Sequence, residues 1–483
     1  MGFSLPLFVT KEPKVLMKAC EARIYLKESA YMRWLTRDRN YYHSLITLAI
    51  PVALQSLITF LVSFADNLMV NSLGDAAVSG VYMGSQIQTF IQMFTSGVGG
   101  AILIIAAQYW GKKETQSIRT IIAIGLRISL IVGLVFTCIG LFVPEQIIRF
   151  FTQDEGVIAE GTIYLRWVCL SFVFFCITQA LISAMRSVEV TRIGMLVSLA
   201  SLVVNISLNY VLIFGKLGFE PMGVKGAAIA TVFSRITETA VVAYYVFIHD
   251  KRLGFKLKHL LLKNRLLTKD FIRYGLPLVA GEIVWSVNMM CNSKILGGYG
   301  ETVITAASVV NTLNTLAYIT IGGLASAVGI ITGKTIGAGK TELMKEYART
   351  TQILFLCVGV LTGAFVFLIG PGFVGLYGGI SAEAAKQSMN LARVLSVTII
   401  GTGYQMPCLF GLVKSGGDIS FVFRNDSIFV FLVVLPSAFL AAYLGAPAWI
   451  TFACLKCDQI LKCFVAVVKV NRYNWMKKLT REA

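Results

Sequence analysis

The sequence predicts an all-α integral membrane protein whose twelve transmembrane helices form two pseudo-symmetric six-helix bundles. Its 483 residues are 56% hydrophobic and only 14% charged, whereas a soluble domain carries roughly 25% charged residues. Apolar stretches of about 20 residues, the length needed to cross a bilayer, recur along the whole chain. The pattern of these stretches repeats once, which divides the chain into two similar halves.

Lys and Arg collect in alternate loops between the predicted spans, as they do in the cytoplasmic loops of membrane proteins. This asymmetry predicts a multi-pass protein of the plasma (inner) membrane with both termini in the cytoplasm. It also accounts for the net charge of +18, so nucleic acid is not an expected partner. The predicted spans are about 44–70, 82–108, 118–143, 161–186, 190–214, 224–248, 271–296, 303–333, 347–370, 387–413, 419–444 and 447–470.

A basic segment near the middle of the chain predicts a linker between the two halves, and the other domain boundaries follow from the spans. The predicted domains are a cytoplasmic N-terminal extension (1–43), a first six-helix bundle (44–248), a basic cytoplasmic linker (249–270), a second six-helix bundle (271–470) and a cytoplasmic tail (471–483).

An internal repeat relates the two halves. Pro51 and Pro277 lie 226 residues apart, and so do Gly111 and Gly337. Each half has six predicted spans, an even number, so both halves share one orientation in the membrane. They are therefore expected to be related by an axis along the membrane normal with a cavity between them, which is typical of transporters.

The apolar stretch Pro51–Gly74, which overlaps the first predicted span, contains one acidic residue at membrane depth, Asp66. Intramembrane acids usually mark ion or proton pathways, although Asp66 could instead be a structural acid paired with a base. Asn205 and Asn209 are four residues apart and project from one helix face, and Thr231 follows one helix later. These four residues are candidates for proton coupling or for an oxygen-rich Na⁺ site. The alternative for the amides and the hydroxyl is hydrogen bonding between helices.

The corresponding span of the second half provides the candidate substrate-binding residues. Glu282 lies one turn into this span, followed by Trp285 and Asn288, and Asn292 occupies the position equivalent to Asp66. A carboxylate beside an aromatic ring can hold an organic cation. The alternative for Glu282 is an acid favoured by the helix dipole.

Three other acids lie in predicted spans and are weaker candidates. Glu238 has no assigned role, Asp426 has Arg424 close in sequence, and Asp458 is expected to pair with Lys462 four residues later.

Neither an enzyme nor a nucleotide-driven pump is indicated. The stretch 328–335, VGIITGKT, has valine in place of the first glycine of a phosphate-binding loop, and no strand is expected before it. We find no nucleophile motif, no metal-ligand cluster and no intramembrane histidine. We therefore expect no nucleotide and no cofactor other than H⁺ or Na⁺ as a coupling ion.

Several segments, in this order, resemble the multidrug and toxic compound extrusion (MATE) family. They include AAQYWGKKE (106–114), AMRSVEVTR (184–192), GLPLVAGEIVWS (275–286) and WITFACLKCDQILK (449–462). The resemblance covers about 44–470. It implies a V-shaped pair of six-helix bundles that exports mainly cationic or amphipathic organic compounds by alternating access, in exchange for H⁺ or Na⁺.

The resemblance also implies roles for individual residues. Asp66 is similar to the family's coupling carboxylate, and Asn205 and Thr231 match the residues that assist it in one branch of the family. Asn209 stands where that branch has aspartate, which removes one negative charge. Glu282 is similar to a seventh-helix glutamate of another branch, although it lies earlier on its helix. Either acid, or both, is therefore a candidate for coupling.

The alternative function is a flippase for a lipid-linked oligosaccharide or another amphipathic lipid, as in the related superfamily. A flippase of this kind is expected to have a strongly cationic central cavity. A channel is disfavoured because duplicated bundles are suited to rocking motions rather than to a fixed pore. We expect the transporter to act as a monomer.

Overall fold

The computed structural model describes residues 35–375 and 381–481, and all secondary structure in these residues is helical. Most of the predicted extension 1–43 lies outside the described residues. The first bundle contains α2 (Arg39–Asn71), α3 (Asp75–Gly111), α4 (Thr115–Phe142), α5 (Pro144–Phe151), α6 (Glu155–Val168), the 3₁₀ turn η1 (Cys169–Ser171), α7 (Phe172–Ser187), α8 (Arg192–Phe214), α9 (Gly223–Tyr244) and the π-helical turn η2 (Tyr245–His249).

A linker with the 3₁₀ turn η3 (Leu257–Leu261) leads into the second bundle. The second bundle contains α10 (Arg265–Gly297), α11 (Glu301–Gly337), α12 (Thr341–Gly375), α13 (Ala382–Met406), the π-helical segment η4 (Pro407–Lys414), α14 (Ile419–Ile428), the π-helical segment η5 (Phe429–Val434), α15 (Leu435–Tyr443) and α16 (Ala448–Asn471).

The all-helical, two-bundle architecture confirms the predicted fold class, but the predicted number of twelve spans is not confirmed. In the described part of the chain, ten helices are both long enough and apolar enough to cross a membrane. Helices α10 and α16 are not among them, although they are 33 and 24 residues long. At 1.5 Å per residue both exceed the roughly 30 Å hydrocarbon core. Both carry polar residues within their apolar stretches: α10 has Glu282 and Asn288, and α16 has Lys456, Asp458 and Lys462.

The two bundles meet in a pair of reciprocal close contacts, which confirms their pseudo-symmetry. A Cβ atom placed on Gly111 of α3 would lie 2.0 Å from the carbonyl oxygen of Lys334 on α11. A Cβ on Gly337 of α11 would lie 1.9 Å from the carbonyl oxygen of Gln108 on α3. Each contact maps onto the other by the 226-residue repeat. Only glycine permits this approach, so the symmetry axis passes between α3 and α11.

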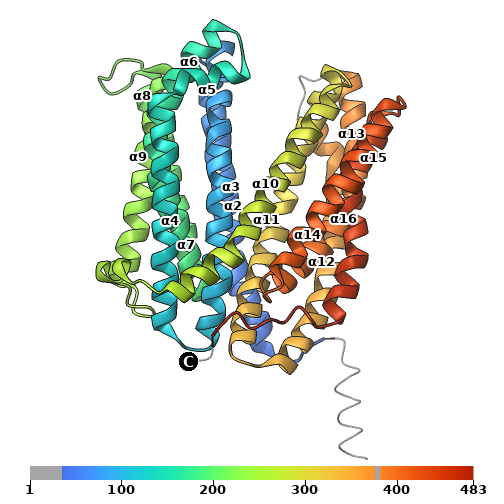
Figure 1. Cartoon of the computed structure of the whole chain (residues 1–483). Helices are drawn as coiled ribbons and strands as arrows, with labels where there is room; N and C mark the ends of the chain where they lie inside the picture. Colours follow the sequence, from blue (N-terminus) through green and yellow to red (C-terminus); the bar gives the residue numbers. More distant parts are fainter. Residues whose placement is uncertain (1–34, 376–380, 482–483) are drawn as a thin grey trace, which may run out of the picture.

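The bundles are close together at the end of the molecule that carries the C-terminus and diverge towards the opposite end (Figure 1). We call the first of these the closed end. Helix α2 packs against both α8 of its own bundle and α11 of the other, and α3 packs against α10 and α11. Helices α2 and α10 each contain an internal proline, Pro51 and Pro277. A proline inside a helix removes one backbone hydrogen bond and favours bending there.

The C-terminal segment also connects the two bundles at the closed end. The Lys477 amide donates to the Gly416 carbonyl of the second bundle at 2.8 Å. Two residues later, the Leu479 amide donates to Oε1 of Gln108 in the first bundle at 2.7 Å. The Trp475 ring, which is fully buried, lies directly against Gly416. The residues after α16 therefore form an ordered strap across the closed end (Figure 1).

Candidate functional site

The first bundle brings Asp66, Asn205 and Asn209 together, as predicted. Asp66 lies on α2, and the two asparagines lie one helical turn apart on α8. The Asn209 amide nitrogen donates to Asp66 Oδ1 and, at 3.2 Å, to Asn205 Oδ1. Both asparagines are only 1% exposed. The carboxylate is therefore held by an amide donor that is itself fixed by a second amide.

The Asn209 side-chain oxygen is buried and has no hydrogen-bond partner in the described structure. A buried polar atom without a partner is costly and usually indicates a water, an ion or a functional role. Here the unpartnered oxygen belongs to the same amide that contacts Asp66. A carboxylate and amide oxygens are the hard ligands that small cations prefer. The site can therefore accommodate a proton on Asp66 or a small cation beside it.

Thr231 is not joined to this group by a hydrogen bond in the described structure. Its hydroxyl donates to the Ala227 carbonyl one turn earlier on α9, at 3.0 Å. The predicted set of four oxygen ligands is therefore connected only in part, through Asp66 and the two asparagines.

An ion pair on α9 lies near the Asp66 group, and sequence reasoning gave it too little weight. Arg235 Nη1 donates to both carboxylate oxygens of Glu238 at 2.8 Å. Arg235 also interacts electrostatically with Asp66, and its guanidinium lies 4.9 Å from the Phe175 ring centroid. The spacing of three residues between Arg235 and Glu238 is the signal that could have identified the pair.

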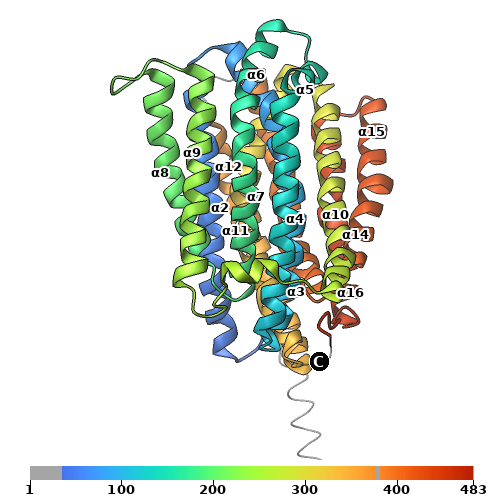
Figure 2. The same cartoon turned by 60° about the vertical axis from the view of Figure 1, so that its left-hand side comes forward.

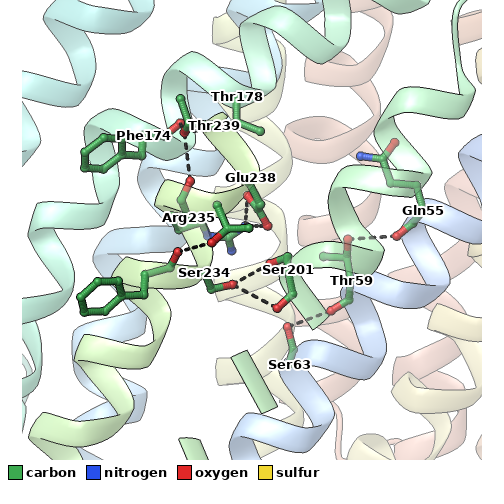
Figure 3. Close-up of polar contacts among 12 residues, drawn as sticks. Gln55, Thr59, Ser63, Phe174, Thr178, Ser201, Ser234, Arg235, Glu238 and Thr239 are labelled. Carbon is green, nitrogen blue, oxygen red and sulfur yellow. Dashed lines mark hydrogen bonds and ion pairs between the residues drawn. The ribbon is translucent and has the colours of Figure 1, made fainter. Parts of the chain in front are cut away.

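Hydroxyl groups surround this ion pair and connect neighbouring helices (Figure 3). Ser201 of α8 and Ser234 of α9 are joined at 2.7 Å, and Thr178 of α7 and Thr239 of α9 at 2.9 Å. The interior of the first bundle thus contains an ion pair among hydroxyl groups and, in addition, the carboxylate of Asp66, which has no direct salt bridge in the described structure.

In the second bundle, the predicted substrate-binding residues have different environments. Glu282 Oε1 lies 3.9 Å from Lys414 Nζ, so this acid already has a cationic neighbour. Trp285 is 47% exposed and available for contact. Asn288 and Asn292 lie one turn apart on α10, and each has a buried side-chain oxygen without a hydrogen-bond partner in the described structure. These two oxygens are further candidates for contact with a substrate.

A buried ion-pair group in the second bundle was predicted only in part. Lys462 Nζ lies 3.0 Å from Asp458, as expected from their spacing, and 2.9 Å from Asp426 on α14. The neighbour of Asp426 suggested by sequence, Arg424, instead donates to the Ser420 carbonyl at 3.2 Å. The contact between Lys462 and Asp426 joins α16 to α14 and could not be read from spacing within one helix.

These features define the class of protein: a two-bundle membrane transporter with a buried carboxylate group in its first half. The MatE family model matches residues 51–211 and 277–440, which is most of the chain. The chain therefore belongs to the MatE family.

Individual relatives and solved structures agree with this assignment. A protein named "Probable multidrug resistance protein NorM" from Listeria innocua is 26% identical over 334 residues, which cover 69% of this chain and 73% of that protein. A crystal structure of MATE in complex with MaL6 has a TM-score of 0.82 at 20% identity and covers 90% of this chain and 97% of its own. An outward-facing multidrug resistance MATE family transporter has a TM-score of 0.79 at 20% identity, with 89% and 96% covered. The structural similarity establishes the fold.

Proposed function

We propose that this protein is a secondary active multidrug efflux transporter that exports cationic or amphipathic organic compounds in antiport with H⁺ or Na⁺. The observation that carries the proposal is the group formed by Asp66, Asn209 and Asn205, with an unpartnered amide oxygen beside a carboxylate inside a transporter fold. The relative from Listeria innocua, which bears a multidrug resistance name, supports the proposed activity.

The proposed orientation places the closed end in the cytoplasm. The basic linker before α10 and the described chain ends lie at this end, and cytoplasmic segments of membrane proteins are rich in Lys and Arg. The diverging ends of the bundles then face outwards, and the structure corresponds to an outward-open state.

Coupling in this proposal acts through α2. When Asp66 takes up a proton or a cation, its negative charge is neutralised and its hydrogen bond with Asn209 weakens. Helix α2 contains Pro51 and packs against both α8 and α11, so a change at Asp66 can reach the contact between the bundles. Ion and drug then each favour a different state, and ion entry shifts the population towards drug release.

In the second half, a cationic drug would compete with Lys414 for Glu282 and would lie near the exposed Trp285 ring. The buried side-chain oxygens of Asn288 and Asn292 are acceptors without a partner in the described structure. A cation that carries N–H donors would satisfy them, so this face of α10 is the proposed contact for the drug.

Three cations in the membrane region give the flippase alternative no support. Arg235, Lys414 and Lys462 each lie within 4 Å of a carboxylate. A phosphate would therefore have to displace an acid at each of them.

The proposal is tested with purified protein in liposomes loaded with ethidium, with a proton gradient or a sodium gradient imposed separately. We expect ethidium transport when one of the two gradients is imposed and only passive leak without a gradient. If ethidium moved at the same rate with the proton gradient, with the sodium gradient and with no gradient, secondary active antiport would be contradicted.

A further inference from the structure

A second group of charges lies far from the proposed coupling site, in a cavity at the closed end. The cavity has a volume of about 600 Å³ and lies between α4, the end of the linker and the first turns of α10. Its lining contains four basic residues and no acidic residue. The lining residues are Arg127, Lys263, Asn264, Arg265, Thr268, Lys269 and Ile272.

The basic residues of this cavity are not neutralised by the protein. In the described ranges of the chain we find no carboxylate within ion-pair distance of Arg127, Lys263, Arg265 or Lys269. The nearby acid Asp270 is instead paired with Arg481 at 2.6 Å. Four unneutralised cations around one cavity repel each other, so an anion between them would lower the electrostatic energy.

Arg127 holds one wall of the cavity in place. Its Nε donates to the Ala123 carbonyl at 3.0 Å and its Nη2 to the Leu262 carbonyl at 2.5 Å. The guanidinium is therefore oriented by the backbone of α4 and of the linker, and its remaining donors are not used in the described structure. An oriented guanidinium is well suited to bind phosphate oxygens.

Exposed apolar side chains continue from the cavity along both neighbouring helices. On α4, Ile131 and Leu134 follow Arg127 by four and seven residues, and both are exposed. On α10, Ile272 and Leu276 are exposed in the same way. Both helices run from the closed end into the membrane region. A ligand that fits this surface has an anionic head and apolar chains.

The linker has the properties of a segment that lies at the membrane surface. Leu261 in η3 is 80% exposed, and Lys258 and Lys263 lie close to it in sequence. Exposed leucines beside lysines are typical of segments that insert into the headgroup region. The linker follows the side of the first bundle near the closed end (Figure 2).

We infer that this cavity binds the phosphate headgroup of an anionic phospholipid from the leaflet at the closed end. Basic pockets between transmembrane helices on the cytoplasmic side are known to bind anionic lipid headgroups. Arg127 belongs to the first bundle, and Arg265 and Lys269 belong to the second. One headgroup therefore contacts both bundles and favours their approach at this end.

The test is native mass spectrometry of the full chain with added phosphatidylglycerol or phosphatidylcholine, without any ion gradient or drug. The pocket variant is Lys263→Gln, Arg265→Gln, Lys269→Gln, which leaves Arg127 and its structural hydrogen bonds unchanged. The control variant is Lys340→Gln, Arg472→Gln, Lys478→Gln, which removes the same charge from exposed positions outside the cavity lining. Melting temperatures in phosphatidylcholine confirm that both variants are folded.

We expect the wild type and the control variant to bind one phosphatidylglycerol in preference to phosphatidylcholine. One basic residue near an anionic surface strengthens binding about fivefold, so the pocket variant should bind about a hundredfold more weakly. Equal binding by the two variants, or no preference for phosphatidylglycerol in the wild type, would overturn the inference. Displacement of the lipid by inorganic phosphate at millimolar concentration would show that the site is for free anions instead. Because no transport is measured, these outcomes are independent of the proposed efflux activity.

Discussion

Lys462 joins two carboxylates in the interior of the second bundle, and we expect it to make a large electrostatic contribution to the stability of that bundle. Its ammonium lies 2.9 Å from Asp426 and 3.0 Å from Asp458, and its side chain is 8% exposed. Replacement of Lys462 by methionine keeps most of the side-chain volume but leaves the buried carboxylate of Asp458 and the half-buried carboxylate of Asp426 without a cation. Breaking a buried ion pair by removal of one partner costs about 3–5 kcal/mol. We expect a loss of this size in the free energy of unfolding.

The measurement is unfolding of the purified protein by titration with a denaturing detergent, followed by circular dichroism. Lys462→Arg, which keeps the charge, is the control and should retain most of the stability. The triple variant Lys462→Met, Asp426→Asn, Asp458→Asn should regain a large part of the loss, because it has no unpaired charge. A Lys462→Met variant within about 0.5 kcal/mol of the wild type, the range of ordinary surface substitutions, would refute the reasoning.

Two further predictions concern the closed end. A Cβ atom added at Gly337 would lie 1.9 Å from the Gln108 carbonyl oxygen, so Gly337→Val forces the bundles to separate there. Cross-linking between cysteines placed on the two sides of this contact should therefore decrease. Unchanged cross-linking would contradict the close approach of the bundles. Burial alone would raise the pKa of Asp418, but ion pairs with Lys469 and Lys477 at 2.7 and 2.8 Å prevail and hold it below its usual 3.8. The contribution of ionised Asp418 to the free energy of unfolding is thus complete above about pH 4 and is lost as the pH falls through the lowered pKa. Thermal unfolding of Asp418→Asn should therefore differ from the wild type at neutral pH and converge with it in acid, whereas a constant difference would contradict the ion pairs.

The sequence allowed prediction of the features that depend on local pattern. Hydrophobic length predicted the helices, and the 226-residue spacing of Gly111 and Gly337 predicted the pseudo-symmetry of the two halves, although not the close contact that these glycines make between the bundles. The spacing of four residues between Asn205 and Asn209 predicted that both project from one helix face, and in the structure the Asn209 amide donates to both Asp66 and Asn205. Regular spacing within a helix fixes which side chains share a face.

Contacts between helices distant in sequence were harder to predict. The contact of Asp426 with Lys462 depends on how α14 and α16 pack, and the spacing of residues within either helix contains no information about it. The hydroxyl of Thr231 bonds within its own helix, because threonine in a helix can satisfy itself on the carbonyl four residues earlier. The basic cavity beside α4 was visible in the sequence only as a basic linker, since Arg127 joins it from a helix more than 130 residues away.

The central claim is that the charge on Asp66 couples ion entry to drug export. The most direct measurement compares wild type, Asp66→Asn and the exposed control Asp75→Asn in liposomes, with gradient-driven efflux and drug exchange at equilibrium measured on the same preparations. We expect Asp66→Asn to lose gradient-driven efflux but to retain drug exchange, whereas Asp75→Asn behaves as the wild type. Gradient-driven efflux at the wild-type rate in Asp66→Asn would contradict the coupling role of this residue.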